Sequence, residues 1–354
     1  MTKQNIHIIR LVLCLTVSLF AAACSSDSEH DSAQTGDILQ LVTYTRSFAD
    51  QTRAVPAGYN AYSPSVGTVI EVFMTPDKTT PGSFTYNGLE WHSSIPVKVM
   101  QYYIYGYMPG SAVSGSSIEM QGESYADGAL LTLGGLSPVS NEDVCVITGI
   151  QGMYNQTDEQ NVKLGLFSYM GQPQGHNYVN LLMDHIYAGL QFRILVNSTY
   201  NELRTIKLKS MTLSMKSGGT ASATIPLTAN TTGARPIGTI TWTKEGSDDV
   251  AVTLFESEEG EELGAVTAKI VEGYVIPGHE NTDNISLTCI YDVYDRKRNL
   301  IRKDCRAENR LPTSLDIVSL QAGERQPINL EVNPTYLYML SDPELDNPTI
   351  TVGN

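Results

Sequence analysis

The segment Thr205-Ile-Lys-Leu-Lys-Ser-Met-Thr-Leu-Ser-Met215 carries the pattern that decides the fold. Apolar and polar residues alternate along it, which is the period of a β-strand with one buried face. The apolar phase slips by one residue at Ser210. A β-bulge at Ser210 would return both apolar sets to one face, and two separate strands are the alternative.

Short apolar or alternating runs of this kind recur along the chain, and Gly, Pro, Asn and Asp separate them. No segment has a long, capped 3.6-residue period, so little helix is expected. Strands at this spacing are typical of β-sandwiches and barrels. The predicted strands are 38–45, 67–74, 101–107, 130–133, 143–150, 162–169, 189–196, 205–215, 264–275, 284–294 and 328–332.

The expected fold is therefore all-β, in two tandem β-sandwich domains. The 354 residues are enough for two ordinary domains. A turn-rich break at 171–177, rich in Gly, Gln and Pro, is where the chain is expected to divide. We predict an N-terminal sandwich at 38–178 and a C-terminal sandwich with a tail at 179–354.

The N-terminus has the pattern of an export signal. Lys3 and Arg10 accompany an apolar run at 11–20, which is too short to be a stable membrane anchor. Ala21-Ala-Ala-Cys24 and the polar residues after it resemble a bacterial lipobox. The resemblance implies a signal peptide at 1–23, lipid on Cys24 and a flexible tether at 24–37; a plain signal peptide with a chance cysteine is the alternative.

The charge of the chain argues against nucleic acid as a partner. The formal net charge is -15, and the first 23 residues carry two cations and no acids. An acidic surface of this kind repels phosphate backbones.

The sequence contains no catalytic signature. GxSxG, HExxH, Walker and GxGxxG motifs are absent, and the histidines are scattered singly. No CxxC pair occurs, so neither a metal site nor a cofactor is expected. Cys145 is predicted to be a buried core thiol, and His185 to be structural. The chain is not expected to be an enzyme.

Cys289 and Cys305 flank two predicted strands that surround a turn. If Lys297 is the centre of that turn, the two cysteines face each other and a cross-strand disulfide fits. A turn shifted by one residue would place them on opposite faces. The sequence leaves both registers open.

Four sequence features follow one another along the chain. They are the lipobox followed by a β-prone segment ending in Arg46; a Tyr-Asn-Gly…Trp block at 86–91 followed by an aromatic strand ending in Tyr-Met-Pro at 107–109; a His-x-x-Ala strand that begins Asp184-His185-Ile-Tyr-Ala188; and a late Ala-Gly…Ile-Asn-Leu-Glu-Val strand at 322–332. Together these features resemble the fimbrillin family, the lipoprotein pilins of Bacteroidetes.

The resemblance implies Greek-key, transthyretin-like sandwiches and a route of assembly. An Arg-specific protease would cut after Arg46, or after Arg53 as second choice, and remove the strand at 38–45. A strand from another pilin subunit would then fill the vacated groove by β-strand addition. The segment at about 335–354 is the candidate donor. The implied location is the outer membrane and cell surface, with a lipid anchor and a host or bacterial surface ligand.

Two other functions compete with a pilus subunit. Trp91 and the aromatic run at 101–107 can stack on sugars, which fits a glycan-binding surface lipoprotein that does not polymerise; core packing is the other role for these rings. An envelope hydrolase would need a cleft with converging carboxylates. Arg46 and Arg53 also fit unprocessed cations in an exposed loop.

Overall fold

The structure, a computed structural model, describes residues 40–50, 58–62, 64–93, 100–151, 162–163, 166–169, 178–229, 237–278, 284–311, 315, 317–335 and 344–353. Strands dominate these ranges, which confirms the all-β prediction. The helical elements named here are short: η1 (Gly110–Ala112), α2 (Ser198–Asn201) and η5 (Ile317–Ser319). Among the described residues, none of the helices has the length and apolar character needed to cross a membrane.

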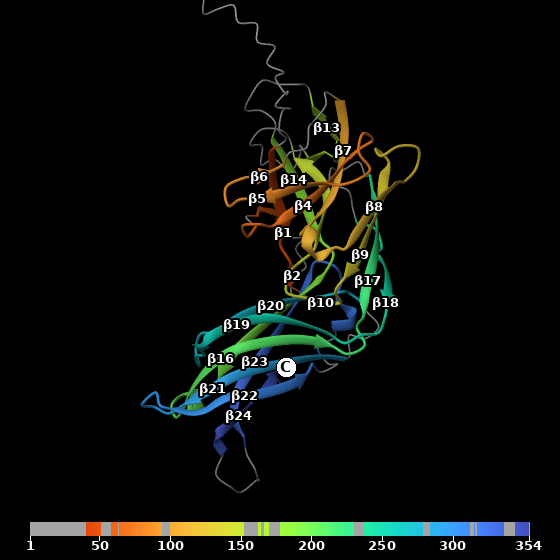
Figure 1. The fold of residues 1–354 in the computed structure, drawn as a ribbon. Coiled ribbons are helices and arrows are strands. Elements are labelled where there is room, and N and C mark those ends of the chain that lie inside the picture. Colours follow the sequence, from red (N-terminus) through yellow and green to blue (C-terminus); the bar gives the residue numbers. More distant parts are fainter. Residues whose placement is uncertain are drawn as a thin grey trace, which may run out of the picture.

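The largest sheet has ten strands, all from the first half of the chain or its midpoint (Figure 1). Its main order is β3-β1-β14-β11-β7-β4-β5-β6, with β12 added to β11 and β13 added to β7. The strands are β1 (Gln40–Arg46), β3 (Tyr59–Ala61), β4 (Val69–Thr75), β5 (Gly82–Tyr86), β6 (Trp91–His92), β7 (Met100–Met108), β11 (Cys145–Gln151), β12 (Val162–Lys163), β13 (Leu166–Tyr169) and β14 (Tyr178–His185).

One face of this sheet builds a core from its own strands. Strand residues alternate between faces, so every second apolar residue points to the same side. These side chains form a single cluster, which we call the sheet core. Strand β6, at one end of the sheet, contacts β1, the second strand from the other end. The buried members are Leu41, Ile70, Val72, Met74, Phe84, Trp91, Tyr102, Ile104, Met108, Cys145, Ile147, Ile150, Val179, Leu181 and Met183.

The opposite face is covered by a four-stranded sheet in the order β18-β17-β9-β8. Phe73 and Tyr105 from the large sheet pack there against Leu131 and Ile225. The strands are β8 (Gly115–Met120), β9 (Gly128–Leu136), β17 (Thr220–Thr228) and β18 (Thr241–Glu245), and Figure 1 shows them along one side of the upper body.

The remaining strands form a second pair of packed sheets, in the lower part of Figure 1. Their facing apolar side chains make the largest of the three core clusters described here. One sheet runs β10-β20-β15-β23-β2, with β24 also on β23, and the other runs β19-β16-β21-β22. The strands are β2 (Ala49–Asp50), β10 (Val139–Ser140), β15 (Ala188–Val196), β16 (Thr205–Met215), β19 (Val250–Glu262), β20 (Lys269–Val275), β21 (Ile285–Tyr294), β22 (Leu300–Arg310), β23 (Glu324–Thr335) and β24 (Glu344–Gly353).

The β-bulge predicted at Ser210 is confirmed. The pairing of β16 with both β19 and β21 shifts between Leu208 and Ser210. Ile206 and Leu208 before the shift and Met211 after it are all fully buried. The extra residue therefore keeps both apolar sets on the core face of one continuous strand.

The packed sheets agree with β-sandwich architecture, and the Greek-key order stays a prediction. The division near 178 also stays a prediction, and strands on both sides of it pair with each other. β14 begins at Tyr178 and lies inside the large sheet between β1 and β11. β17 pairs with β9, β10 pairs with β20, and β2 pairs with β23.

Gly106 is the one residue without a side chain in the aromatic strand β7, and the backbone of the neighbouring strand β4 comes very close to it. A Cβ atom at this position would lie 2.2 Å from the backbone oxygen of Glu71 and 2.9 Å from Cδ1 of Ile147. A glycine inside a strand often marks such a close approach. At Gly115 in β8, by contrast, a Cβ atom would meet nothing within 4 Å.

The substitution Gly106→Ala should therefore destabilise the large sheet. Inserting atoms into a packed site costs roughly 1–3 kcal/mol, so we expect a loss of unfolding free energy of at least that size. Gly115→Ala is the matched control and should stay within about 0.5 kcal/mol of the parent chain. Urea unfolding followed by tryptophan fluorescence measures both, and equal midpoints for the two variants would contradict the close approach.

Candidate functional site

Arg46 lies at the end of β1, where the pairing of three strands brings distant residues together. β1 runs parallel to β14, and Thr45 pairs with Met183. Asp184 and His185, the next residues of β14, therefore lie beside Arg46. On the other side, β3 is antiparallel to β1 and pairs Tyr59 with Arg46.

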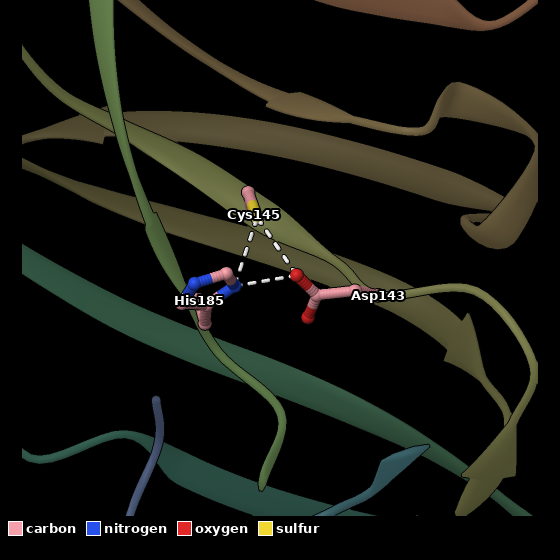
Figure 2. Close-up of side chains that lie close together, drawn as sticks. All are labelled: Asp143, Cys145 and His185. Atoms are coloured by element: carbon pink, nitrogen blue, oxygen red, sulfur yellow. Dashed lines mark hydrogen bonds and ion pairs between the residues drawn. The ribbon is translucent and has the colours of Figure 1, made fainter. Parts of the chain in front are cut away.

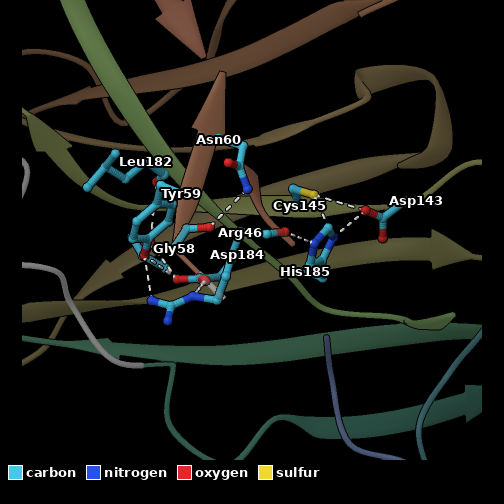
Figure 3. A network of polar contacts seen from close by, with 10 residues as sticks. Arg46, Gly58, Tyr59, Asn60, Asp143, Cys145, Leu182, Asp184 and His185 are labelled. Carbon is cyan, nitrogen blue, oxygen red and sulfur yellow. Dashed lines mark hydrogen bonds and ion pairs between the residues drawn. The ribbon is translucent and has the colours of Figure 1, made fainter. Parts of the chain in front are cut away.

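The guanidinium of Arg46 is held by an ion pair and a ring, as Figure 3 shows. Its Nε lies 2.5 Å from Oδ1 of Asp184, and its Nη2 donates to Oη of Tyr59 at 3.0 Å. The guanidinium carbon lies 4.6 Å from the centre of the Tyr59 ring. Oδ2 of Asp184 accepts from Tyr59 and from Oγ1 of Thr148, both at 2.8 Å. We call this group the arginine clamp.

The arginine clamp favours the charged form of Arg46. Burial by itself would lower the pKa of the guanidinium, but the charge of Asp184 and the contacts with Tyr59 outweigh it and raise that pKa. Burial and the nearby Asp184 carboxylate raise the pKa of Tyr59, which keeps its hydroxyl protonated as a donor. The Arg46 side chain remains 38% exposed, so water screens part of the interaction.

The peptide carbonyl of Arg46 is held as well. Nε2 of His185 forms a hydrogen bond with it. The ring of Phe48, two residues further along, stacks on the His185 ring with 3.8 Å between their centres. Both the side chain and the backbone of Arg46, the residue at which cleavage is predicted, are therefore engaged by consecutive residues of β14.

The other nitrogen of His185 belongs to a buried cluster with Asp143 and Cys145, drawn in Figure 2. Nδ1 lies 2.5 Å from Oδ2 of Asp143 and 3.4 Å from Sγ of Cys145. Sγ of Cys145 donates to the same Oδ2 at 3.1 Å. Burial opposes the charged imidazolium, but Asp143 and the Arg46 carbonyl raise the pKa of His185 above its usual value.

This cluster does not have the geometry of a nucleophilic triad. In a triad one ring nitrogen meets the nucleophile and the other meets the acid. Here the thiol and the carboxylate meet the same nitrogen, Nδ1 of His185. Burial, followed by the charge of Asp143, raises the pKa of Cys145 well above its usual value, so its thiolate is disfavoured.

The cluster and the end of β1 line one cavity of about 490 Å³. Residues from the first sheet and residues from the second pair of sheets meet around it. Its lining is Thr45, Arg46, Ser47, Phe48, Tyr62, Ser65, Thr68, Met108, Pro109, Asn141, Glu142, Asp143, Cys145, His185, Tyr274 and Arg325.

Only some of the predicted site residues lie in the part of the chain that the structure describes. Arg46 lies at this site, and its processing stays a prediction. Cys24, the signal peptide at 1–23, the tether at 24–37 and Arg53 lie outside the described residues.

Of the arrangements that the sequence left open for Cys289 and Cys305, the one in which the two cysteines face each other is not observed. Both thiols are free and buried. Near the turn, Tyr294 pairs with Leu300, as a turn centred on Lys297 requires. Two register shifts follow, so that Cys305 lies opposite Tyr291 and Cys289 lies opposite Ala307.

A local contact explains this shift in the β21–β22 hairpin. Asp304 has a positive φ of 53°, and its N–H donates to Oδ1 of Asp292 at 2.7 Å. Such a bulge was not visible in the alternation of the sequence. Burial raises the pKa of Cys289 to about 12, so this thiol stays protonated.

The aromatic residues considered for sugar binding belong to the core. Trp91 is 4% exposed and packs with Tyr86 at 5.5 Å between ring centres. Tyr102, Tyr105 and Tyr107 of β7 are buried too. These four rings pack in the core and offer no exposed face for a glycan, and Tyr103 of the same run is half-buried against the core.

No local sequence pattern groups the residues around Arg46. Tyr59, Asp143, Thr148 and Asp184 come from separate strands and loops, and only long-range pairing brings them together. Asp184-His185 was the one available signal, because it begins the motif that resembles the fimbrillin family.

Similar solved structures come from cell adhesion and fimbrial proteins of Bacteroidetes. A putative cell adhesion protein from Bacteroides fragilis is 12% identical, with 90% of this chain and 97% of that chain covered and a TM-score of 0.44. A fimbrial protein from Bacteroides vulgatus is 11% identical, with 88% and 98% covered and a TM-score of 0.30. A fimbrial anchor protein from Porphyromonas gingivalis is 11% identical, with 88% of this chain and 97% of that chain covered and a TM-score of 0.25.

No protein-family model and no curated protein matches the sequence. At the identities and TM-scores of these solved structures, the likeness does not support an inference about function.

The arginine clamp should slow proteolysis after Arg46. Asp184→Asn removes the charge that pairs with the guanidinium, and a charge-assisted hydrogen bond contributes roughly 1.5–3 kcal/mol. Because Arg46 is partly exposed, we expect the lower end of that range, which corresponds to about a tenfold faster cut by trypsin. Limited digestion of the full-length chain, with the fragment ends read by mass spectrometry, measures this rate.

Asp304→Asn is the matched control for that experiment. It removes a carboxylate that also forms an ion pair, with Lys209, but in the second pair of sheets. The cut after Arg46 should keep its parental rate in this variant. If Asp184→Asn and the parent chain are cut at the same rate, Asp184 does not restrain Arg46.

Proposed function

We propose that this chain is a surface-exported lipoprotein that serves as a structural or adhesive pilus subunit. In this account lipid on Cys24 holds the precursor at the outer membrane, and a protease cuts after Arg46. The strand at 38–45 leaves, and a strand from another subunit takes its place. The position of β1 in the large sheet is the observation that carries the proposal.

The position of β1 suits a strand that is exchanged. β1 pairs with β14 at six consecutive positions, and on its other side it pairs with the three-residue strand β3. Its departure would leave backbone N–H and C=O groups of β14 unpaired. Unpaired groups of a buried edge are costly and pair readily with any matching strand.

β1 also fills part of the sheet core. Leu41 is 4% exposed and belongs to the sheet core, and Thr43 is 1% exposed with its hydroxyl bonded to the Tyr62 carbonyl at 3.1 Å. Loss of β1 would therefore open an apolar pocket beside the vacated edge. A donor strand can match both features at once: the backbone pairing gives affinity, and alternate side chains give specificity.

The residues after Arg46 favour this arginine over Arg53 as the processing site. Phe48 stacks on His185 and on Tyr274, and β2 pairs with β23. A cut after Arg46 releases β1 and leaves the new N-terminus attached to the second pair of sheets. A cut after Arg53 would remove β2 as well.

We propose the C-terminal segment as the donor. In the free chain, its strand β24 pairs antiparallel with β23, and Ile350 is buried there. The segment would have to detach from β23 before it pairs with another subunit. Pro348, which lacks an N–H, lies in this strand near the register shift between Asn333 and Thr335.

A synthetic peptide of residues 38–46 tests strand exchange. The full-length chain, digested with an Arg-specific protease, should form filaments that electron microscopy detects. Excess peptide should refill the groove and reduce filament formation. A peptide with Leu41→Asp is the matched control and should not inhibit, because it would bury an unpaired charge in the sheet core.

Two results would contradict the proposal. One is filament formation without cleavage, in the Arg46→Ala and Arg53→Ala double variant. The other is inhibition by the Leu41→Asp peptide as strong as that by the natural sequence, which would mean that the groove is not the place of assembly.

A further inference from the structure

Asp143, Cys145 and His185 bring three different metal-ligand types to one point. Their nearest oxygen, sulfur and nitrogen atoms all lie within 4.8 Å of one another. Cys145 and His185 are buried, and the Asp143 side chain is 16% exposed. Figure 2 shows the three side chains directed toward each other from the start of β11 and the end of β14.

We propose that these three residues bind one thiophilic divalent cation, of the Zn²⁺ class. A thiolate, an imidazole and a carboxylate are all ligands that Zn²⁺ accepts, and the thiolate disfavours Ca²⁺ and Mg²⁺. Three protein ligands leave a fourth position for water. The cavity that the three residues line provides access for the ion and for that water.

An unsatisfied carboxylate oxygen supports this site. Oδ1 of Asp143 is buried and has no hydrogen-bond partner, while Oδ2 already faces Cys145 and His185. A buried acceptor without a partner costs about 1–3 kcal/mol, more when it is charged. A cation coordinated by Asp143 would offset this cost.

The second nitrogen of His185 makes the contact that a metal ligand usually makes. Ligating histidines almost always donate the other ring N–H to a carboxylate, a backbone carbonyl or water. Nε2 of His185 forms a hydrogen bond with the Arg46 carbonyl, so Nδ1 is the nitrogen available to the cation. The stacked Phe48 ring fixes the orientation of the imidazole.

The geometry requires a small opening of the cluster. Two ligands of a tetrahedral Zn²⁺ lie roughly 3.3–3.6 Å apart, given bond lengths of about 2.0–2.3 Å. The distance of 3.4 Å between Cys145 and His185 already fits, whereas the 2.5 Å contact of Asp143 with His185 and its 3.1 Å contact with Cys145 must lengthen.

Coordination replaces two hydrogen bonds with three bonds to the cation. The thiol of Cys145 and the Nδ1–H of His185 each give a proton to solvent, so that both atoms coordinate the cation without a proton. No oxidation or reduction takes place.

Metal binding would also strengthen the hold on Arg46. A neutral His185 with Nδ1 on the cation carries its only proton on Nε2, and that proton points to the Arg46 carbonyl. The bound cation therefore keeps the Nε2 proton directed at the Arg46 carbonyl and fixes the ring that restrains the Arg46–Ser47 peptide. This consequence does not depend on pilus assembly, because it concerns the precursor alone.

Titration of the full-length, chelator-treated chain with Co²⁺ tests the site. Co²⁺ takes the place of Zn²⁺ and reports a thiolate ligand through a charge-transfer absorption band. We expect the band to saturate at one equivalent, to disappear on adding Zn²⁺, and to be absent in Cys145→Ser. Asp143→Asn, which keeps the size of the side chain, should weaken binding by at least about tenfold.

Cys289→Ser is the matched control, since Cys289 is another buried free thiol. It should keep the band, and circular dichroism shows whether each variant is folded. Zn²⁺ should also slow the tryptic cut after Arg46 in the parent chain but not in Asp143→Asn. The proposal is overturned if the folded parent chain gives no stoichiometric band, or if the band persists unchanged in Cys145→Ser or in Asp143→Asn.

Discussion

The parallel pairing of β1 with β14 is the contact on which the N-terminal half depends. It fills the edge between β14 and β3, and it places Leu41 in the sheet core. It also fixes the register that sets Arg46 beside Asp184 and His185. β1 completes both a hydrogen-bonded edge and an apolar core. If it leaves without a replacement, backbone groups of β14 stay unpaired and apolar side chains of the sheet core become exposed.

The same register places the side-chain contacts that restrain β1 at Arg46, its last residue. The guanidinium of Arg46 meets Asp184 and Tyr59, and its carbonyl meets His185, which in turn contacts Asp143. These contacts surround a single peptide bond between the exchangeable strand and the segment that pairs with the second half. In the proposed route of assembly, the strength of these contacts would govern how easily a protease reaches that bond.

The sequence predicted features that depend on local pattern. The all-β class follows from alternation, and the bulge at Ser210 follows from a phase slip that a strand can correct in only a few ways. β17 was not predicted, because its buried residues include the small Ala221 and Ala223, and Pro226 interrupts its pattern. Its pairing with β9 across the predicted division is a long-range contact.

The candidate site was predictable in part, for the same reason. Arg46 could be identified because it ends an apolar, β-prone segment. Its partners could not, since Tyr59 and Asp184 reach it only through strand pairing between distant parts of the chain. The sequence left the register of Cys289 and Cys305 open, because the contact between Asp304 and Asp292 that adds a bulge is not marked by any sequence pattern.

Hydrogen exchange of the β14 backbone tests strand replacement most directly. Amides of β14 that face β1 should exchange slowly in the precursor, quickly in the cleaved chain that has lost β1, and slowly again in assembled filaments. Protection that persists after β1 has left, or that fails to return on assembly, would contradict the account.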